Sequence, residues 1–327
     1  MTPKLYRIKD FQKDTEIQGF FLVREKHRRT TRTDRPYLQL VLQDGTGSIE
    51  AKVWENVPAF EKSFQEGDSV AVRARVSEFN ERLQIEVIDI GVASTEKHAA
   101  YGFDPMDLLP STPEDVDVMW SELQQMMHTM ESEPLRKLVT TLYEANAEVI
   151  RTHPASMVLH HAVFGGFLEH IHSMAVLGKH LAAHYHLDAD LLLTGILLHD
   201  IGKVRELRPV SHPGYTDAGQ LIGHIVQGYE MVMETIDAQP DFPPDLRLKI
   251  GHMILAHQGR YEWQSPKRPK FPEALLLHYL DELDARMNMM REIMDKDPES
   301  GSWTNRFNYY RLPILKGDLD LDAADSD

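Results

Sequence analysis

Two spacings of apolar residues divide the chain. From Glu16 to Val92 apolar and polar positions alternate, which is typical of half-buried strands. From about residue 113 to Met294 the period is 3.6, which is typical of amphipathic helices. We therefore predict a multidomain protein with a β domain at 1–92, a linker at 93–113, an all-α domain at 114–315 and an acidic, disordered tail at 316–327.

The first part contains five runs with strand character. The turn Asp44–Gly47 joins the second run tightly to the third. Five short strands in this length fit a small closed barrel better than a sandwich. The run Tyr37–Trp54 resembles strands two and three of the OB-fold in its nucleic-acid-binding versions. The predicted strands are 17–23, 37–42, 49–54, 69–76 and 83–90.

Alternation in the second and third runs turns the aliphatic side chains inward and Tyr37, Gln39, Lys52 and Trp54 outward. Aromatic and basic residues on one barrel face form a platform on which unpaired bases can stack. A basic stretch from residue 24 to 35 precedes them. The alternative is that the aromatic residues pack against the second domain and that the basic stretch is a solvated hairpin tip. The predicted nucleic-acid contacts here are Arg24, Arg28, Arg29, Arg32, Tyr37, Lys52 and Trp54.

The second part contains several amphipathic runs that end at glycine, proline or polar residues. Short connections between them favour a bundle of antiparallel neighbours. We expect a core lined by the apolar faces of these helices. The predicted helices are 113–131, 133–150, 156–185, 189–200, 217–237, 245–258 and 271–295.

Composition limits the chemistry. The chain has no cysteine, so a metal site must use His, Asp or Glu. The net charge of -16 argues against a nucleic-acid partner, but residues 1–92 hold 15 basic and 15 acidic residues, and the deficit lies beyond them. No segment approaches the roughly 20 apolar residues of a membrane helix, and the first residues lack the apolar core of a signal peptide. We expect a cytoplasmic protein without a membrane partner.

Histidines gather in the second domain. Fourteen of the 17 lie in the 126 residues from position 153 to 278, where an even spread would place about 6.5. Some lie on apolar helix faces and others at helix ends, and ligands in a bundle core come from the inward faces of several helices. A carboxylate in an apolar stripe is unfavourable unless it is paired or bound to metal. The candidate metal ligands are His170, His199, Asp200, His224, His257 and Asp281.

The order of these residues resembles the HD-domain superfamily of metal-dependent phosphohydrolases. Five phrases behind an OB-fold are similar, more narrowly, to the YhaM-type 3'-5' exoribonucleases, and the resemblance covers roughly residues 15 to 295. The chain departs from that family at Gln258, where a second histidine is usual, and at Gln264, where glycine is frequent. The phrases are Leu168–His170, Leu198–Lys203, Gly223–Ile225, His257–Trp263 and Leu277–Arg286.

The candidate residues take different roles in a site of this kind. Asp200 is the candidate bridge and catalytic residue, because a carboxylate has two oxygens and can hold two cations. His170, His199 and Asp281 would complete one metal site, and His224 and His257 the other. Lys203 is the second catalytic candidate and would hold a phosphate oxygen; the alternative is that it neutralises a helix carboxyl end. Asp284 is expected to orient a ligand histidine.

Three residues near the metal ligands are predicted to contact nucleic acid: His161, Arg260 and Arg286. A surface position at a helix start is the alternative for His161. Surface ion pairs are the alternative for the two arginines.

The resemblance implies a metal-dependent 3'-5' exoribonuclease that releases nucleoside 5'-monophosphates from single-stranded RNA, with single-stranded DNA as a second candidate substrate. It favours two Mn²⁺ ions and leaves Mg²⁺, Co²⁺, Fe²⁺ and Ni²⁺ open. One alternative is a phosphohydrolase of nucleotides or cyclic dinucleotides with a regulatory barrel. Another is a nucleic-acid-binding protein with a purely structural metal site. A homo-oligomer is a further expectation.

Overall fold

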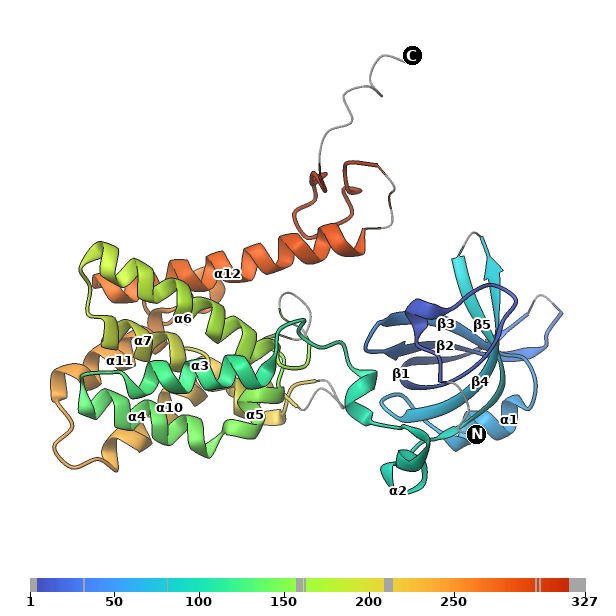
Figure 1. Ribbon diagram of the computed structural model, residues 1–327, viewed down its shortest axis with the longest axis horizontal. Helices are drawn as coiled ribbons and strands as arrows, with labels where there is room; N and C mark the ends of the chain where they lie inside the picture. Colours follow the sequence, from blue (N-terminus) through green and yellow to red (C-terminus); the bar gives the residue numbers. More distant parts are fainter. Residues whose placement is uncertain are drawn as a thin grey trace, which may run out of the picture. The chain divides into compact units, whose positions relative to one another are not determined.

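The chain folds into two compact units. The computed structural model describes residues 5–31, 33–80, 82–156, 161, 163–208, 214–297, 299 and 301–317. Unit 1 comprises Met1–Pro113 with Arg208–Gly214, and unit 2 comprises Glu114–Leu207 with Tyr215–Asp327. Strands dominate unit 1 and helices dominate unit 2 (Figure 1), which confirms the predicted fold class. Each helix in the described ranges is too short or too polar to cross a membrane.

Unit 1 contains a closed barrel of five strands in the order β1-β2-β3-β5-β4. Neighbouring strands are antiparallel except β3 and β5, which run parallel, and this is the arrangement expected of an OB-fold. The aliphatic residues predicted to face inward from the second and third strands are all buried. The strands are β1 (Glu16–Thr30), β2 (Pro36–Asp44), β3 (Gly47–Val53), β4 (Ser69–Phe79) and β5 (Arg82–Val92).

Strand β1 is longer than alternation predicts, and this changes the interpretation of the basic stretch. The predicted strand ends at residue 23, whereas β1 continues to residue 30 and stays paired with β2. Backbone hydrogen bonds extend this half of the hairpin without a buried face. It therefore contains few apolar residues, and alternation does not predict it. Arg24, Arg28 and Arg29 therefore lie on a strand and not in a loop. Arg32 lies outside the described residues.

The stretch 93–113, predicted as a linker, is ordered against the barrel of unit 1. It holds α2 (Thr95–His98) and two 3₁₀ turns. Phe103 is buried, and its ring centroid lies 4.9 Å from that of Phe20 on β1. The backbone N–H of Gly45 donates to the carbonyl oxygen of Asp107 at 2.8 Å. This stretch thus packs against the barrel. The predicted tail lies outside the described residues from position 318 onward.

The helices of unit 2 lie where the 3.6-residue period predicts them, but three are interrupted or shortened. The predicted helix 133–150 divides at Asn146, where φ is -123° and the side-chain amide donates to the Leu142 carbonyl oxygen at 2.8 Å. The predicted helix 217–237 divides at Gly223, where φ is 79°. The predicted helix 156–185 begins only at Gly166. Local backbone geometry determines where these helices begin and divide. The spacing of apolar residues does not reveal that geometry.

The described helices of unit 2 are these: α3 (Val116–His128), α4 (Glu133–Ala145), α5 (Ala147–Thr152), α6 (Gly166–Tyr185), α7 (Ala189–Leu198), α8 (Lys203–Glu206), α9 (Asp217–Ile222), α10 (His224–Asp237), α11 (Pro244–Ala256) and α12 (Pro272–Lys296).

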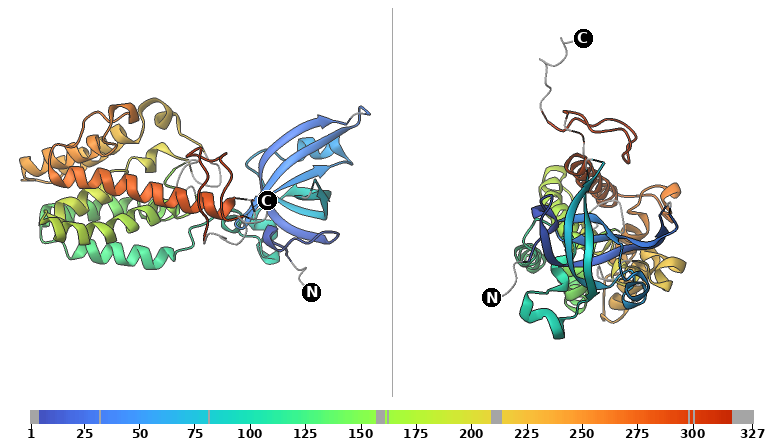
Figure 2. Two further views of the ribbon diagram at one scale, coloured as in Figure 1. Left: turned by 90° about the horizontal axis from the view of Figure 1, so that it is seen from above. Right: turned by 90° about the vertical axis from the view of Figure 1, so that its right-hand side faces the viewer.

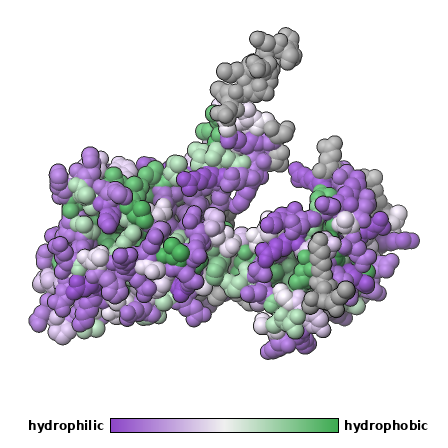
Figure 3. All heavy atoms as spheres, viewed as in Figure 1, coloured by the Kyte–Doolittle hydropathy of each residue, from purple (hydrophilic) through white to green (hydrophobic). Residues whose placement is uncertain are grey.

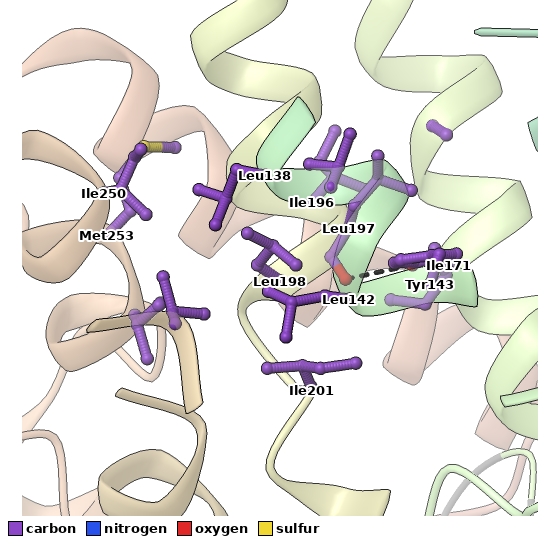
Figure 4. Close-up of a cluster of buried hydrophobic side chains, with 14 of the residues drawn as sticks. Leu138, Leu142, Tyr143, Ile171, Ile196, Leu197, Leu198, Ile201, Ile250 and Met253 are labelled. Carbon is purple, nitrogen blue, oxygen red and sulfur yellow. Dashed lines mark hydrogen bonds between the residues drawn. The ribbon is translucent and has the colours of Figure 1, made fainter. Parts of the chain in front are cut away.

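The core of unit 2 surrounds α7 and fixes its carboxyl end. Leu197, Leu198 and Ile201 lie among side chains of α4, α6 and α11 (Figure 4). Tyr143 of α4 is buried, which raises the pKa of its hydroxyl, and this hydroxyl donates to the Leu197 carbonyl oxygen at 2.9 Å. The carbonyls in the last turn of a helix have no partner within that helix, so this bond satisfies one of them. The carboxyl end of α7 is therefore held in place, and this fixes the position of the residues that follow it.

Candidate functional site

Five elements of unit 2 meet at the residues predicted to bind metal. α12 packs against α6 and α7 (Figure 2), and α10 packs against α11. Positions within α6 and α12 therefore face the carboxyl ends of α7 and α11 and the start of α10. The residues brought together are His170, His199, Asp200, His224, His257 and Asp281.

His170, His199 and Asp281 form the first group of this site. His170 Nε2 lies 3.3 Å from Asp281 Oδ1, and His199 Nε2 lies 3.9 Å from the same oxygen. Both histidines are completely buried. One ligand atom from each residue lies within 4.8 Å of the others, so the three side chains can share one metal ion.

Asp200, His224 and His257 form the second group. Asp200 Oδ1 lies 3.3 Å from His224 Nε2 and 3.6 Å from His257 Nε2. The other oxygen, Oδ2, lies 3.3 Å from His199 Nε2, which belongs to the first group. The two oxygens of one buried carboxylate thus face two groups of ligands. A carboxylate that bridges two metal ions requires this arrangement.

Two of the four histidines are oriented by helix-end carbonyls. His199 Nδ1 lies 2.9 Å from the Ile196 carbonyl oxygen, and His257 Nδ1 lies 2.8 Å from the Ile254 carbonyl oxygen. In both cases the acceptor lies three residues earlier, in the last turn of the helix. A proton on Nδ1 leaves the lone pair on Nε2, which is the atom that faces the other ligands.

The other two histidines are oriented by carboxylates. Asp284 Oδ2 lies 2.7 Å from His170 Nδ1, so Asp284 makes the contact predicted for it. Glu206 Oε2 lies 3.1 Å from His224 Nδ1, and Glu206 Oε1 accepts a hydrogen bond from the His224 backbone N–H at 3.0 Å. Sequence reasoning missed Glu206, because α8 is too short to show a periodic pattern.

Three buried atoms of the site have no hydrogen-bond partner among the described residues. They are His199 Nε2, His224 Nε2 and Asp200 Oδ1. Buried polar atoms are nearly always paired, and these three come from the two groups described above. Imidazole nitrogen and carboxylate oxygen are ligands that divalent transition metals accept. The residues present therefore fit a divalent metal ion.

The electrostatic field of the site favours a bound cation. Burial and the neighbouring His199 lower the pKa of His257 to about 4, so its ring is neutral at pH 7, as metal binding requires. Burial also lowers the pKa of His170, but Asp281 and Asp284 outweigh this and raise it to about 9. The carboxylates thus attract positive charge to His170 Nε2, whether a proton or a metal ion provides it.

Lys203, the second catalytic candidate, forms a buried ion pair with Asp200. The distance between Nζ and Oδ2 is 2.5 Å. Burial alone would raise the pKa of Asp200, but Lys203 and His199 hold it well below its ordinary range. Burial alone would lower the pKa of Lys203, but Asp200 raises it. Lys203 is the first residue of the four-residue helix α8, which follows the carboxyl end of α7 closely.

Two cavities lie beside the ligands, and we refer to them together as the cleft. Their volumes are about 360 and 260 Å³, and both are lined by Lys203, Gln258 and Trp263. The larger cavity extends to His224 and the smaller to Asp281. Space for a substrate therefore lies directly beside both groups of ligands.

Gln258 and His161 take different positions around the site. Gln258 Nε2 lies 3.1 Å from His257 Nε2, so this amide reaches a candidate ligand. His161 is 3% exposed, and its Nε2 lies 3.0 Å from Asp284 Oδ2 while its Nδ1 lies 3.1 Å from Glu169. A ring held on both sides by carboxylates has no surface for a nucleotide. The structure therefore does not support the predicted nucleic-acid contact of His161.

The two arginines of the helical unit that are predicted to contact nucleic acid both lie at the surface. Arg260 lies over the ring of Trp263, with 4.5 Å from the guanidinium carbon to the ring centroid, so it borders the cleft. Arg286 lines the smaller cavity and forms an ion pair with Glu282 at 2.7 Å. The alternative of a surface ion pair is thus present for Arg286.

On the barrel, outward residues form a surface that we call the aromatic face: Tyr37, Lys52, Trp54 and Phe79. The ring centroids of Tyr37 and Trp54 lie 4.7 Å apart, and Lys52 Nζ lies 5.0 Å from the ring centroid of Phe79. Trp54 is 44% exposed and Phe79 is 58% exposed. Exposed rings beside a cation are suited to stacking of unpaired bases.

Of the arginines predicted on β1, Arg29 lies beside this face in the strand register. Arg24, Arg28 and Arg29 are exposed. Arg28 forms an ion pair at 2.9 Å with Glu61 of α1 (Val57–Ser63), a helix that alternation did not predict. Arg29 lies directly opposite Tyr37, and residues directly opposite each other in a sheet share a face.

Two protein families match parts of the chain. The family described as "HD domain" matches residues 167–286, and the family described as "OB-fold nucleic acid binding domain" matches residues 22–93. The first range contains all six candidate metal ligands, and the second contains the aromatic face.

Similar proteins cover nearly the whole chain. The chain is 32% identical over 293 residues to the 3'-5' exoribonuclease YhaM of Oceanobacillus iheyensis, covering 89% of this chain and 90% of that protein. It is 31% identical over 318 residues to the 3'-5' exoribonuclease YhaM of Halalkalibacterium halodurans, covering 95% and 98%. Among solved structures, the second OB-fold domain of replication protein A from Methanococcus maripaludis matches 28% of this chain and 96% of its own length, at 24% identity and a TM-score of 0.24.

Proposed function

The chain belongs to the YhaM family of 3'-5' exoribonucleases, and from this we propose that it removes nucleotides from the 3' end of single-stranded RNA at a site for two divalent metal ions. Family membership and the HD domain make it an enzyme that hydrolyses phosphodiester bonds. The observation that carries the proposal is the position of Asp200, whose two oxygens face two groups of ligands. We propose nucleoside 5'-monophosphates as products, Mn²⁺ as the preferred ion and the cytoplasm as the location.

The residues of the site divide the work of hydrolysis. Divalent ions would supply positive charge to the phosphodiester and lower the pKa of the attacking water. The two groups of ligands would hold these ions, with Asp200 shared between them. Lys203 lines both cavities and would turn from Asp200 to a phosphate oxygen of the substrate, where its charge offsets the charge that develops during attack. Burial of His170, His199, Asp200 and His257 keeps bulk water away from this part of the charge arrangement.

The barrel would hold the strand whose end is hydrolysed. Stacking on the aromatic face is independent of base identity, because every base has a π face. This suits an enzyme that must hold successive nucleotides of any sequence. The proposed division of labour is therefore single-strand binding in unit 1 and hydrolysis in unit 2.

The direct test uses single-stranded RNA labelled at its 5' end, with Mn²⁺, with Mg²⁺ or with a chelator, and products resolved by length. We expect a ladder that shortens from the 3' end when Mn²⁺ is present and intact RNA with the chelator. The same strand as DNA measures the preference for the sugar. An intact strand under every metal condition, together with hydrolysis of a cyclic dinucleotide, would contradict the proposal in favour of a small-molecule phosphohydrolase.

Trp54→Ala is expected to weaken binding of a 20-nucleotide RNA about tenfold, since stacking of one base contributes roughly 1–3 kcal/mol. Binding is measured by fluorescence anisotropy in the presence of chelator, so that the strand stays intact. Tyr101→Ala is the matched control, because Tyr101 is 54% exposed in unit 1 but lies outside the aromatic face. Equal affinity of Trp54→Ala and the unmodified protein would remove the aromatic face from the RNA-binding surface.

A further inference from the structure

We propose that the loop after α12, residues 303–312, is a second base-stacking surface, which holds the nucleotides of the RNA strand that adjoin the cleft. We call it the aromatic loop. It belongs to unit 2, whereas the aromatic face belongs to unit 1. The inference rests on the proposed function, since its ligand is the single strand that the site would hydrolyse.

The aromatic loop borders the place of reaction. Tyr309 lines the smaller cavity of the cleft together with Asp200 and Asp281. Trp263 lines the same cavity, so aromatic rings from two separate segments border the space beside the metal ligands. A nucleotide whose phosphate lies at those ligands would bring its neighbours within reach of the loop.

The loop has a defined backbone. Trp303 and Leu315 form an antiparallel bridge at its base. Within it, the side-chain amide of Asn308 donates to two carbonyl oxygens of the segment, at 2.8 and 2.7 Å. The hydroxyl of Tyr310 donates to the carbonyl oxygen of Arg286 at 3.3 Å, which ties the loop to α12. The loop therefore has a shape before a ligand is bound.

This defined backbone leaves three aromatic rings in solvent. Phe307 is 87% exposed, Tyr309 57% and Trp303 50%. Apolar residues come to the surface in this part of unit 2, beyond α12 (Figure 3). Burial of such rings is normally favourable, and rings that a fold presents on a fixed loop are available to a ligand.

The charge of the aromatic loop indicates which kind of ligand it would bind. The aromatic loop contains two basic residues and no acidic one, in a chain with 51 acidic residues. Arg306 and Arg311 are exposed, and the guanidinium of Arg306 lies 5.7 Å from the ring centroid of Phe307. A ligand that combines flat rings with negative charge matches both features, and an unpaired nucleotide strand has this composition. A purely apolar protein partner would not require the arginines.

The test compares steady-state hydrolysis of two substrates by the full-length protein with Mn²⁺. One substrate is a 20-nucleotide single-stranded RNA, and the other is bis(p-nitrophenyl) phosphate, which has no bases to reach the loop. For the double variant Trp303→Ala with Phe307→Ala, whose rings are exposed and line neither cavity of the cleft, we expect KM for RNA to rise about tenfold or more and the rate with the small ester to stay unchanged. Phe307→Tyr retains a ring at this position and should keep the KM of the unmodified protein. Tyr185→Ala is the control, since Tyr185 is 60% exposed at the end of α6 and does not line the cleft.

The outcomes separate this inference from the proposed function. Unchanged KM for RNA in the double variant overturns the inference while the proposed function stands. Loss of activity on both substrates also overturns it, because the loop would then support the cleft and not the strand. A change of molar mass in light scattering at unchanged KM assigns the loop to contacts between copies of the chain, and it is then not an RNA surface. If the unmodified protein does not hydrolyse RNA, the proposed function fails first and the inference with it.

Discussion

Replacing Asp200 with asparagine is expected to lower kcat for single-stranded RNA by at least about 1,000-fold, equivalent to roughly 4 kcal/mol of transition-state stabilisation. Asparagine preserves the size of the side chain but provides one neutral oxygen. It therefore cannot join the group at His199 to the group at His224 and His257. Initial rates at saturating Mn²⁺, together with the metal content of the purified variant, measure the effect.

Two further variants make this result interpretable. Asp237→Asn likewise removes a carboxylate from an ion pair, but this pair is with Arg247 at the surface of unit 2. This variant should retain the rate of the unmodified protein. His224→Gln leaves the buried Asp200–Lys203 pair intact, so it tests the second group with less risk to folding. We expect it to retain its circular dichroism spectrum and to lose one of two bound ions. If Asp200→Asn unfolds while His224→Gln keeps full activity, the metal site is structural and the catalytic role is wrong.

Gly202→Ala is expected to lower the rate about 100-fold, since a displacement of about 1 Å at reacting groups can have an effect of that size. A Cβ at this position would lie 2.0 Å from the carbonyl oxygen of His224 and 2.6 Å from the backbone N of Gly228. Both are backbone atoms of α10, so the helix must move away. His224 begins this helix, and its Nε2 would shift relative to Asp200.

The measurement for Gly202→Ala combines initial rates on RNA with thermal unfolding. We expect the melting temperature to fall as well, because overpacking of a close contact typically destabilises a protein by about 1–3 kcal/mol. Gly301→Ala is the matched control, since a Cβ there would meet nothing within 4 Å. Wild-type activity in Gly202→Ala would show that the approach of α10 does not set the position of His224.

Gly202 also marks a limit of sequence reasoning. Its place after an apolar helical run suggests a glycine that ends a helix through a left-handed conformation. The structure instead gives it φ of -62° and ψ of -18°, which any residue can adopt. The backbone of His224 excludes a side chain at Gly202. It is adjacent in space but 22 residues later in the chain, and no local sequence pattern predicts such a contact.

Local sequence patterns do indicate the candidate metal ligands. His170 and Asp281 are polar residues on apolar helix faces, and a helix with that pattern must turn them into the core. The groups that orient the ligands were harder to find: Asp284 shares a face with Asp281 and was predicted, but Glu206 has no periodic context. Extension of the β1–β2 hairpin depends on backbone hydrogen bonds. Order in the aromatic loop depends on hydrogen bonds from the Asn308 side chain to backbone carbonyls. The spacing of apolar residues reveals neither.

The hydrogen bonds at the four Nδ1 atoms have a consequence for which ion the cell must supply. Because carbonyls and carboxylates of the protein fix these rings, the donor atoms are arranged by the fold and not by the incoming ion. A rigid cage of nitrogen and carboxylate donors follows the general order of metal affinities, in which Zn²⁺ and Cu²⁺ exceed Mn²⁺. Correct loading would then depend on the relative abundance of free ions. For an enzyme that works with the proposed Mn²⁺, a tighter-binding metal would then compete for the same site.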